Sequence, residues 1–449
     1  MKKLFLVIVV TVFSMRGVGQ TIIQRDPEIE QMVKEISADS LKSYINKLVS
    51  FGTRSTLSAV TDKKRGIGAA REWVVQRFNE FAKNSNGRMT AYFDTTTIPA
   101  DGRRVDVATN LGNAMAVLKG TDPNDDRIYI ISGHLDSRVT DVMNRTADAP
   151  GANDDGSGVA AVMECARVMS KHSFPATIIF VAVSGEEQSL LGSGYLANQA
   201  KMKNWNVDAM LNNDIMGSNN SNETNIIDNT RLRVFSEGIS VLDTGRVLSN
   251  VRGLGLENDS KSRQLARYVK EIGERYVDNL EVVMIYRSDR FLRGGDHSPF
   301  LQKGYAAVRL TEMNENYNHQ HQDVRTDKGI VYGDLSEFMD FEYLRKNTGI
   351  NLSTLANLAK APPIPQDVRI DVRNLTNTTI LSWKSPKNGK VKGYYVLMRE
   401  TTSPVWQKKI FTAETTITLP YSKDNYFFAV QSVNESDNES LAIVPTVGR

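Results

Sequence analysis

The sequence predicts an α/β fold with a mostly parallel central sheet, followed by a small all-β sandwich. Two observations lead to this prediction. Over most of the chain, near-continuous apolar runs of the kind found in strands buried on both faces alternate with segments of helical periodicity. After a proline-rich linker at 360–366, the rest of the chain carries short alternating segments separated by turn signals, without a helical pattern.

The elements of the first part follow in order along the chain. Residues 26–83 are mostly helical in pattern, and Trp73, Val74, Phe78 and Phe81 fall on one helical face. Apolar runs at 127–133, 176–187, 207–217, 280–286 and 305–311 predict strands, and 156–170 and 262–277 predict helices. Such alternation is typical of a three-layer fold, in which functional residues gather at the carboxyl ends of the strands.

The tail, 362–449, predicts a β-sandwich whose core segments are "TILSWKSP", "VKGYYVLMRE", "TTITLPY" and "NYFFAVQSVNES". It resembles a fibronectin type III domain in the prolines at its start, in Trp383 in an early strand, in "GYYV" at 393–396 and in Tyr426 before "FAVQSV". An immunoglobulin-like sandwich of another type is the competing interpretation. A module of this kind leaves open attachment of the protein to a surface or a polymer.

The first residues, 1–20, are expected to be a signal peptide, with basic residues before a short apolar run. The protein is then secreted or periplasmic, and the absence of a cysteine just after the run argues against a lipid anchor; an N-terminal membrane anchor is the alternative. Removing Lys2, Lys3 and Arg16 with the segment lowers the basic residues from 55 to 52, equal to the 52 acidic ones. A neutral chain does not suggest nucleic acid or an anionic membrane as partner.

Chemically active side chains follow the predicted strands. His134 and Asp136 stand in "GHLDS", Asp154 and Asp155 in "GANDDGSG", Glu186 and Glu187 in "SGEEQSLLGS", Asp214 in "NNDIMG", and His319 and His321 in "NHQHQD". Singly, each could be a helix cap or a solvated charge, and Asp155 with Ser157 suits a cap. Together, carboxylates at the ends of apolar strands resist burial unless a cation compensates them. A mixed histidine and carboxylate set suits zinc, and a shared carboxylate can bridge two zinc ions.

With "DHSPF" at 296–300 added, these motifs stand in an order that resembles the co-catalytic zinc exopeptidases of the M28 family, which includes leucyl-type aminopeptidases and glutamate carboxypeptidase-like members. The resemblance covers the domain expected at 25–360, and "LVSFGTRSTLS" at 48–58 fits its usual start. It implies a fold of the zinc exopeptidase type and two Zn²⁺ ions.

The resemblance also implies a role for each motif. His134 and Asp214 would bind the first zinc, Glu187 the second, and Asp154 would bridge both. Asp136 would stand behind His134 and accept its ring N–H, and Glu186 would remain free as the general base for the attacking water.

One more histidine ligand is expected from "NHQHQD". The family's usual form has a histidine four residues before an aspartate, which favours His319 over His321, because His319 stands four before Asp323. His321 remains the alternative, since two histidines two apart on an extended segment face the same side. Tyr317, Asp296 and His297 are expected in the substrate region or the wall of the site.

The expected function is therefore a secreted zinc aminopeptidase acting on peptides with a free N-terminus. A carboxypeptidase or dipeptidase of the same fold is the first alternative, with Arg290, Arg293 and Arg309 available for the substrate carboxylate. A glutaminyl cyclase and a non-catalytic binding protein are weaker alternatives.

Overall fold

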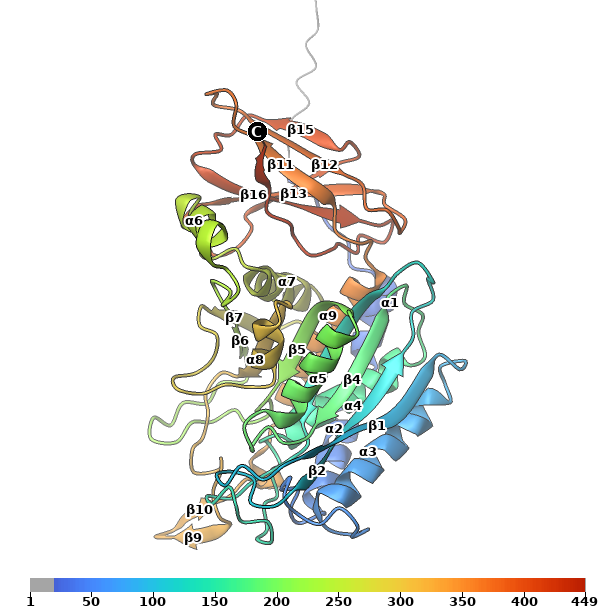
Figure 1. Ribbon diagram of the computed structural model, residues 1–449, viewed down its shortest axis with the longest axis vertical. Helices are drawn as coiled ribbons and strands as arrows, with labels where there is room; N and C mark the ends of the chain where they lie inside the picture. The colour runs from blue at the N-terminus through green and yellow to red at the C-terminus, as the bar shows by residue number, and fades with distance from the viewer. Residues whose placement is uncertain (1–19, 449) are drawn as a thin grey trace, which may run out of the picture.

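An eight-stranded sheet forms the centre of the molecule. In this computed structural model, which describes residues 20–448, its strands follow the order β1-β2-β4-β3-β5-β8-β6-β7 (Figure 1). Their bounds are β1 (Met89–Ile98), β2 (Thr109–Leu118), β3 (Arg127–His134), β4 (Thr177–Val183), β5 (Asn206–Asn213), β6 (Arg231–Phe235), β7 (Glu281–Ile285) and β8 (Ala307–Glu312). The central strands β4, β3, β5 and β8 are parallel to one another, whereas β1–β2, β2–β4 and β6–β8 pair antiparallel. The predicted α/β fold is confirmed, with a parallel centre, an antiparallel edge at β1–β2 and a parallel edge pair β6–β7 joined antiparallel to β8.

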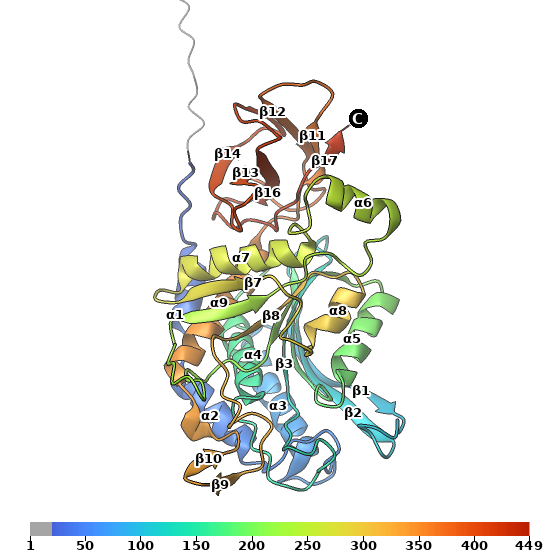
Figure 2. The ribbon, with the colours of Figure 1, turned by 90° about the vertical axis from the view of Figure 1, so that its left-hand side faces the viewer.

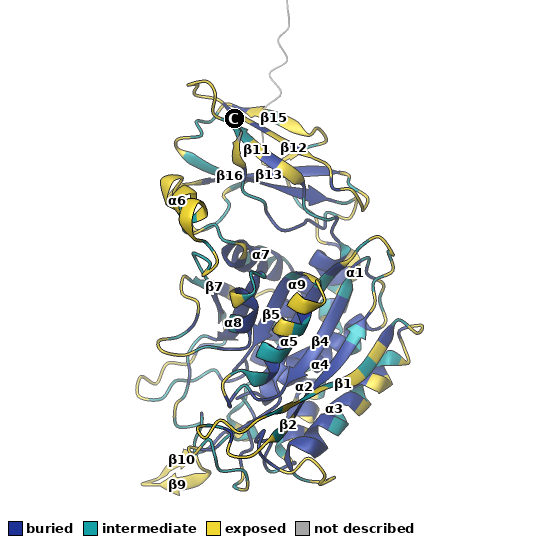
Figure 3. Ribbon diagram, in the orientation of Figure 1, coloured by how far each residue is buried: buried dark blue, intermediate teal, exposed yellow. Residues whose placement is uncertain are grey.

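Helices cover both faces of this sheet and make three layers (Figure 2). One face carries α1 (Pro27–Lys34), α2 (Ala38–Val49), α3 (Gly66–Ala82), α4 (Gly156–Met169), α7 (Lys261–Tyr276) and α9 (Phe341–Lys360). The other face carries α5 (Leu191–Met202) and α8 (His297–Gln302), which bury a separate, smaller apolar core. The burial pattern follows these layers, since the central strands are buried along their length (Figure 3).

The carboxyl ends of β3, β4 and β5 meet at one edge of the sheet. In the parallel register His134 lies opposite Val183, and Ser132 lies opposite Asn212. A Cβ added to Gly133 would lie 2.4 Å from the backbone of Gly158, so glycines let the first turn of α4 approach the end of β3. The segment just before α4 is thereby brought beside His134.

The rest of the chain forms the sandwich. Its strands are β11 (Gln366–Asp371), β12 (Thr379–Lys384), β13 (Gly393–Glu400), β14 (Lys408–Thr412), β15 (Thr416–Leu419), β16 (Tyr426–Val433) and β17 (Thr446–Gly448). They make one sheet of order β15-β12-β11-β17 and another of order β14-β13-β16, which share an apolar core around Trp383, Tyr394 and Phe428. The expected second, all-β part is therefore confirmed as a two-sheet sandwich.

A buried polar contact joins the sandwich to the α/β layer. The Glu439 carboxylate accepts hydrogen bonds from Arg275 of α7 at 2.9 Å and from Lys409 of β14 at 2.7 Å. The Glu439 carbonyl accepts from Tyr268 of α7 at 2.6 Å, and Asn357 of α9 donates to the Tyr268 hydroxyl. We call these five residues the interdomain cluster.

Several elements differ from the sequence expectation or were not foreseen. The hairpin β1–β2, the helix α5 and the 20-residue helix α9 were not predicted. Shorter elements are α6 (Gly245–Gly253), which buries no residue, the hairpin β9 (Arg325–Asp327) and β10 (Ile330–Tyr332), and a 3₁₀ turn at Ser336–Phe338. The expected signal peptide, 1–20, lies outside the described residues except for Gln20. Within the described chain, none of the helices combines the length and apolar character of a membrane span.

Candidate metal centre

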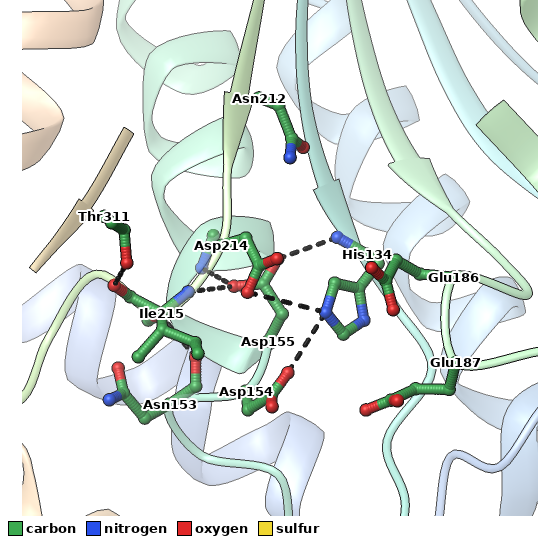
Figure 4. Close-up of polar contacts among 12 residues, drawn as sticks. His134, Asn153, Asp154, Asp155, Glu186, Glu187, Asn212, Asp214, Ile215 and Thr311 are labelled. Atoms are coloured by element: carbon green, nitrogen blue, oxygen red, sulfur yellow. Dashed lines mark hydrogen bonds and ion pairs between the residues drawn. The ribbon is translucent and has the colours of Figure 1, made fainter. Parts of the chain in front are cut away.

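Asp154 lies at the centre of the cluster that the strand ends build (Figure 4). Its Oδ1 is 3.1 Å from His134 Nε2 at the end of β3, and its Oδ2 is 2.9 Å from His321 Nε2. Asp214, just after β5, places its Oδ1 3.9 Å from His134 Nε2, and Glu187, beyond β4, places its Oε1 3.0 Å from His321 Nε2. The two oxygens of one carboxylate thus face two separate histidine and carboxylate pairs.

The ring of His134 is oriented by the chain that follows it. Its Nδ1 lies 2.9 Å from the backbone carbonyl of Asp136, which can only accept, so Nδ1 carries the proton and Nε2 turns its lone pair to the cluster. The Asp136 carboxylate is 3.8 Å from Nδ1 and does not accept from it, which differs from the sequence expectation.

The Asp136 carboxylate instead holds the two glutamates. It accepts the backbone N–H groups of Gly185 at 3.0 Å, Glu186 at 3.2 Å and Glu187 at 3.0 Å. Gly185 has a φ of +79°, a conformation that glycine adopts without steric cost. Asp136 therefore fixes the turn from which Glu186 and Glu187 project.

Asp155 serves as a helix cap, one of the interpretations that the sequence left open. Its carboxylate accepts the N–H of Gly158 at 2.9 Å in the first turn of α4 and the N–H of His134 at 2.7 Å. Burial, with the nearby Asp214 and Asp154 carboxylates, raises the pKa of Asp155 well above its usual range. The residue fastens the loop of Asp154 to the end of β3.

Two residues that the sequence reasoning did not assign hold the Asp154 loop from outside. Asp334 accepts the N–H of Asp154 at 2.7 Å and that of Asn153 at 2.9 Å. The fully buried Arg54 donates to three backbone carbonyls, those of Leu135, Pro150 and Gly151. Arg54 stands in the "GTRS" motif, which could have pointed to it; Asp334 carries no sequence signal.

Asp214 is held by Arg309 of β8. The fully buried guanidinium lies 3.0 Å from Asp214 Oδ2 and 2.9 Å from Asp289 Oδ1. Arg309 was a candidate for binding a substrate carboxylate, but both its carboxylate contacts are internal. It acts here as the cation that permits burial of two acids.

The structure brings His321, rather than His319, into the cluster, which differs from the sequence expectation. The ring of His319 stacks on Phe338, with centroids 3.6 Å apart and planes at 5°. His319 lines a small cavity behind Asp154, whereas His321 lines the open cleft with His134, Glu186 and Asp214. His321 therefore stands where the sequence predicted one of the two histidines.

Glu186 lines the same cleft with an uncommitted carboxylate. Among residues 20–448, no hydrogen bond to its side chain is found, and the side chain is only partly buried. Loss of hydration within the cleft, together with repulsion from Glu187 and Asp214, raises the pKa of Glu186 well above its usual range. Its position and freedom suit an exchange of protons with a molecule in the cleft.

The donor set fits a divalent cation. Each of His134, Asp154 and Glu187 offers an atom within 4.8 Å of the others, and so does each of His134, Glu186 and Asp214. Within the described part of the chain, the buried Oε1 of Glu187 accepts no hydrogen bond, although His321 Nε2 is close to it. Although burial opposes it, the carboxylates of Glu187 and Asp154 raise the pKa of His321 to about 10, so a positive charge is favoured between these groups.

The other predicted residues lie in different places. Tyr317 is 52% exposed and does not line the cleft. Asp296 is fully buried, neither of its oxygens accepts a hydrogen bond from the described residues, and burial raises its pKa to about 7. His297 donates from Nε2 to the Ser288 carbonyl at 2.8 Å, beneath the loop that carries Asp289. Asp296 and His297 thus belong to the wall around the site.

The chain is similar to peptidases of one family. The model described as peptidase family M28 matches residues 113–339. A probable zinc metalloprotease of Leptosphaeria maculans is 44% identical over 433 residues, which cover 96% of this chain and 100% of that protein. A probable zinc metalloprotease of Pyrenophora teres f. teres is 43% identical over 425 residues, 94% of this chain and 87% of that one. The solved structure of the LapA aminopeptidase of Legionella pneumophila aligns with a TM-score of 0.52 at 19% identity, over 77% of this chain and 78% of that chain.

Proposed function

The chain belongs to peptidase family M28, and from that premise we propose that it is a zinc aminopeptidase, with a two-zinc centre, that removes residues from peptides with a free N-terminus. The observation that carries the proposal is the division of Asp154 between two donor pairs. His134, Asp214 and Asp154 would hold one zinc, and Glu187, His321 and Asp154 the other. Relatives of 44% and 43% identity named as probable zinc metalloproteases support the choice of metal.

Bound zinc would polarise the scissile carbonyl and lower the pKa of the attacking water. The chain's own residues supply the proton transfers and the geometry. Glu186 takes the proton from the attacking water at its free carboxylate and gives it to the leaving amine. Asp136 keeps Glu186 and Glu187 on one turn, so the base and the ligand cannot exchange places.

Action at the amino end is supported by the free carboxylate of Glu186 in the cleft. Of the three arginines considered for the carboxyl end of a long peptide, two are paired internally. Arg309 lies between Asp214 and Asp289, and Arg290 lies 2.7 Å from Glu315. The Glu186 carboxylate, which would not bind metal, attracts a protonated amine.

We also propose that the protein acts outside the cytoplasm, secreted or periplasmic, and that its sandwich is of the fibronectin type III kind. The basic and apolar start of the sequence supports the first proposal. The seven strands in two sheets around Trp383 support the second. The sandwich then serves for attachment to a surface or a polymer, or for stability.

The metal assignment is tested by a matched pair of histidine variants. Zinc content measured after dialysis should fall from two ions to about one in His321→Ala and stay at two in His319→Ala. The reverse result, with zinc lost from His319→Ala alone, would contradict the ligand set.

The reaction is tested with the peptide Leu-Gly-Gly and its N-acetyl form. We expect release of leucine from the free peptide only, together with full zinc content and no measurable turnover in Glu186→Gln. Cleavage of the acetylated peptide at a comparable rate would refute the aminopeptidase, and a Glu186→Gln protein of near wild-type rate would refute the general base.

A further inference from the structure

Four arginines line the cleft in front of the metal-binding residues. Arg104 lies in the connection from β1 to β2 and Arg138 follows β3, whereas Arg290 and Arg293 lie in the connection from β7 to α8. They therefore come from three separate connections, which all contribute to one cleft that also contains Glu186 and His321. Sequence reasoning gave no signal for Arg104 or Arg138.

Within residues 20–448, two of these guanidinium groups have no carboxylate partner, and a third has only a distant one. Arg104 donates to the backbone carbonyl of Glu187 at 2.5 Å, and within residues 20–448 neither Arg104 nor Arg293 has a carboxylate within 4.0 Å. Arg138 reaches Glu187 Oε2 only at 3.8 Å and otherwise donates to the carbonyls of Val139 and Thr140. Arg290, by contrast, is held by Glu315 and Asp289.

Metal ions in the centre would leave these arginines with even less attraction to the carboxylates around them. With two divalent cations in place, the charges of Asp154, Glu187 and Asp214 are offset, so Glu187 offers Arg138 little. Arg104 and Arg138 are partly buried in the cleft, whereas Arg293 is exposed. Partly buried guanidinium groups attract an anion more strongly and with less screening by salt. Their planar donors match a carboxylate in a bidentate manner.

We propose that Arg104, Arg138 and Arg293 form a subsite for a carboxylate of the substrate, so that the enzyme prefers substrates with a negative charge within one residue of the scissile bond. The inference rests on the proposed function and names the substrate class of that same site. Such a carboxylate has two sources. It is either the side chain of an acidic residue or the free carboxyl end of a dipeptide, which is compatible with aminopeptidase action because that end lies next to the cleaved bond.

Four compounds separate these sources. Glu-Gly-amide against Gln-Gly-amide tests a side-chain carboxylate, and Leu-Gly against Leu-Gly-amide tests a terminal one. Each pair differs in charge and little in shape, and Leu-Gly-amide reports the proposed function without any carboxylate. We expect kcat/KM to favour the acidic member of at least one pair by roughly tenfold or more, the factor that one charge-assisted hydrogen bond supplies.

Substitutions to glutamine connect the preference to the subsite. The ratio within the preferred pair should fall about tenfold in Arg293→Gln, and also in Arg104→Gln, since each removes one charge-assisted contact. Arg287→Gln and Arg103→Gln are the matched controls: each removes one exposed arginine close in sequence that does not line the cleft, and Arg287 stacks on Phe291. The controls should keep the wild-type ratio.

Ratios near one in both pairs, or ratios that Arg293→Gln and Arg104→Gln leave unchanged, overturn the inference while leaving the proposed function intact if Leu-Gly-amide is cleaved. If none of the four compounds is cleaved, the proposed function fails, and the same compounds are titrated as ligands of the zinc-loaded protein by calorimetry. Tighter binding of an acidic member, lost in Arg293→Gln, then supports the subsite, and equal binding overturns it.

Discussion

Replacing Glu439 by glutamine tests whether the sandwich and the α/β layer stabilise each other. The Glu439 side chain is completely buried in the interdomain cluster. Burial opposes its ionisation, but Arg275 and Lys409 hold the pKa of Glu439 far below its usual range, so the carboxylate is charged at neutral pH. Glutamine has almost the same shape and keeps one acceptor oxygen, so the substitution removes the charge with little change in packing.

The expected loss of stability can be worked out from the ion pairs that Arg275 and Lys409 would lose. Removing one partner of a buried ion pair costs about 3–5 kcal/mol, because the other charge remains buried without compensation. Here Arg275 and Lys409 keep Glu271, whose side chain is 32% exposed and which pairs with both. We therefore expect the lower end of that range, a loss of about 3 kcal/mol in the free energy of unfolding.

Urea unfolding followed by circular dichroism measures this loss. Glu414→Gln is the matched control, because Glu414 lies on the same sandwich, is exposed, and its side chain forms no hydrogen bond or ion pair within residues 20–448. Exposed substitutions of this kind change stability by no more than about 0.5 kcal/mol. If Glu439→Gln and Glu414→Gln unfold at the same urea concentration, the cluster does not couple the two parts, and the reasoning fails.

Three further outcomes follow from the contacts around the site. Although burial opposes it, Arg290 and Arg233 lower the pKa of Glu315 to about 2. The stability that the ionised Glu315 contributes is therefore present above the ordinary glutamate pKa of about 4.3 and is lost as the pH falls towards 2. Melting temperatures measured across this pH range should fall less steeply in Glu315→Gln. Asp136→Asn should fold, yet lose roughly 10–100-fold in zinc affinity or kcat, because one amide oxygen cannot accept three N–H groups; equilibrium dialysis and kinetics check this. Arg309→Met should lower the free energy of unfolding by about 3–5 kcal/mol in urea titrations, because two buried acids lose their cation.

The ends of the strands could be predicted from the sequence because each depends on a short stretch of chain. Apolar runs identify β3, β4 and β5, and a parallel arrangement then brings the residues after them to one edge. His134, Asp154, Glu187 and Asp214 meet for this reason. The helix cap by Asp155 could be predicted as one possibility from the glycines and the serine beside it.

The residues that support these ligands could not be predicted in the same way, because their contacts join distant parts of the chain. Asp334 holds the N–H of Asp154 across 180 positions, and Arg54 reaches the Gly151 carbonyl across 97. Periodicity within a window carries no information about such pairs. Arg309 shows the difficulty in another form: an arginine in an apolar strand has the same sequence pattern whether it binds a substrate or a buried acid.

The preference for His319 over His321 did not take account of the backbone conformation of this segment. Two histidines two apart face the same side only if the segment between them is extended, and here it is not. The chain turns at 316–319, where the N–H of His319 donates to the Asn316 carbonyl, and His321 has a φ of +55°, in the left-handed region. This turn sends the ring of His319 against Phe338 and the ring of His321 towards Asp154 and Glu187. A left-handed conformation at a residue with a side chain costs about 1–2 kcal/mol, so it persists where surrounding contacts determine it. Many different sequences can make contacts that stabilise a left-handed residue. The spacing between His319 and Asp323 therefore could not reveal this conformation, and only the three-dimensional arrangement distinguishes the two histidines.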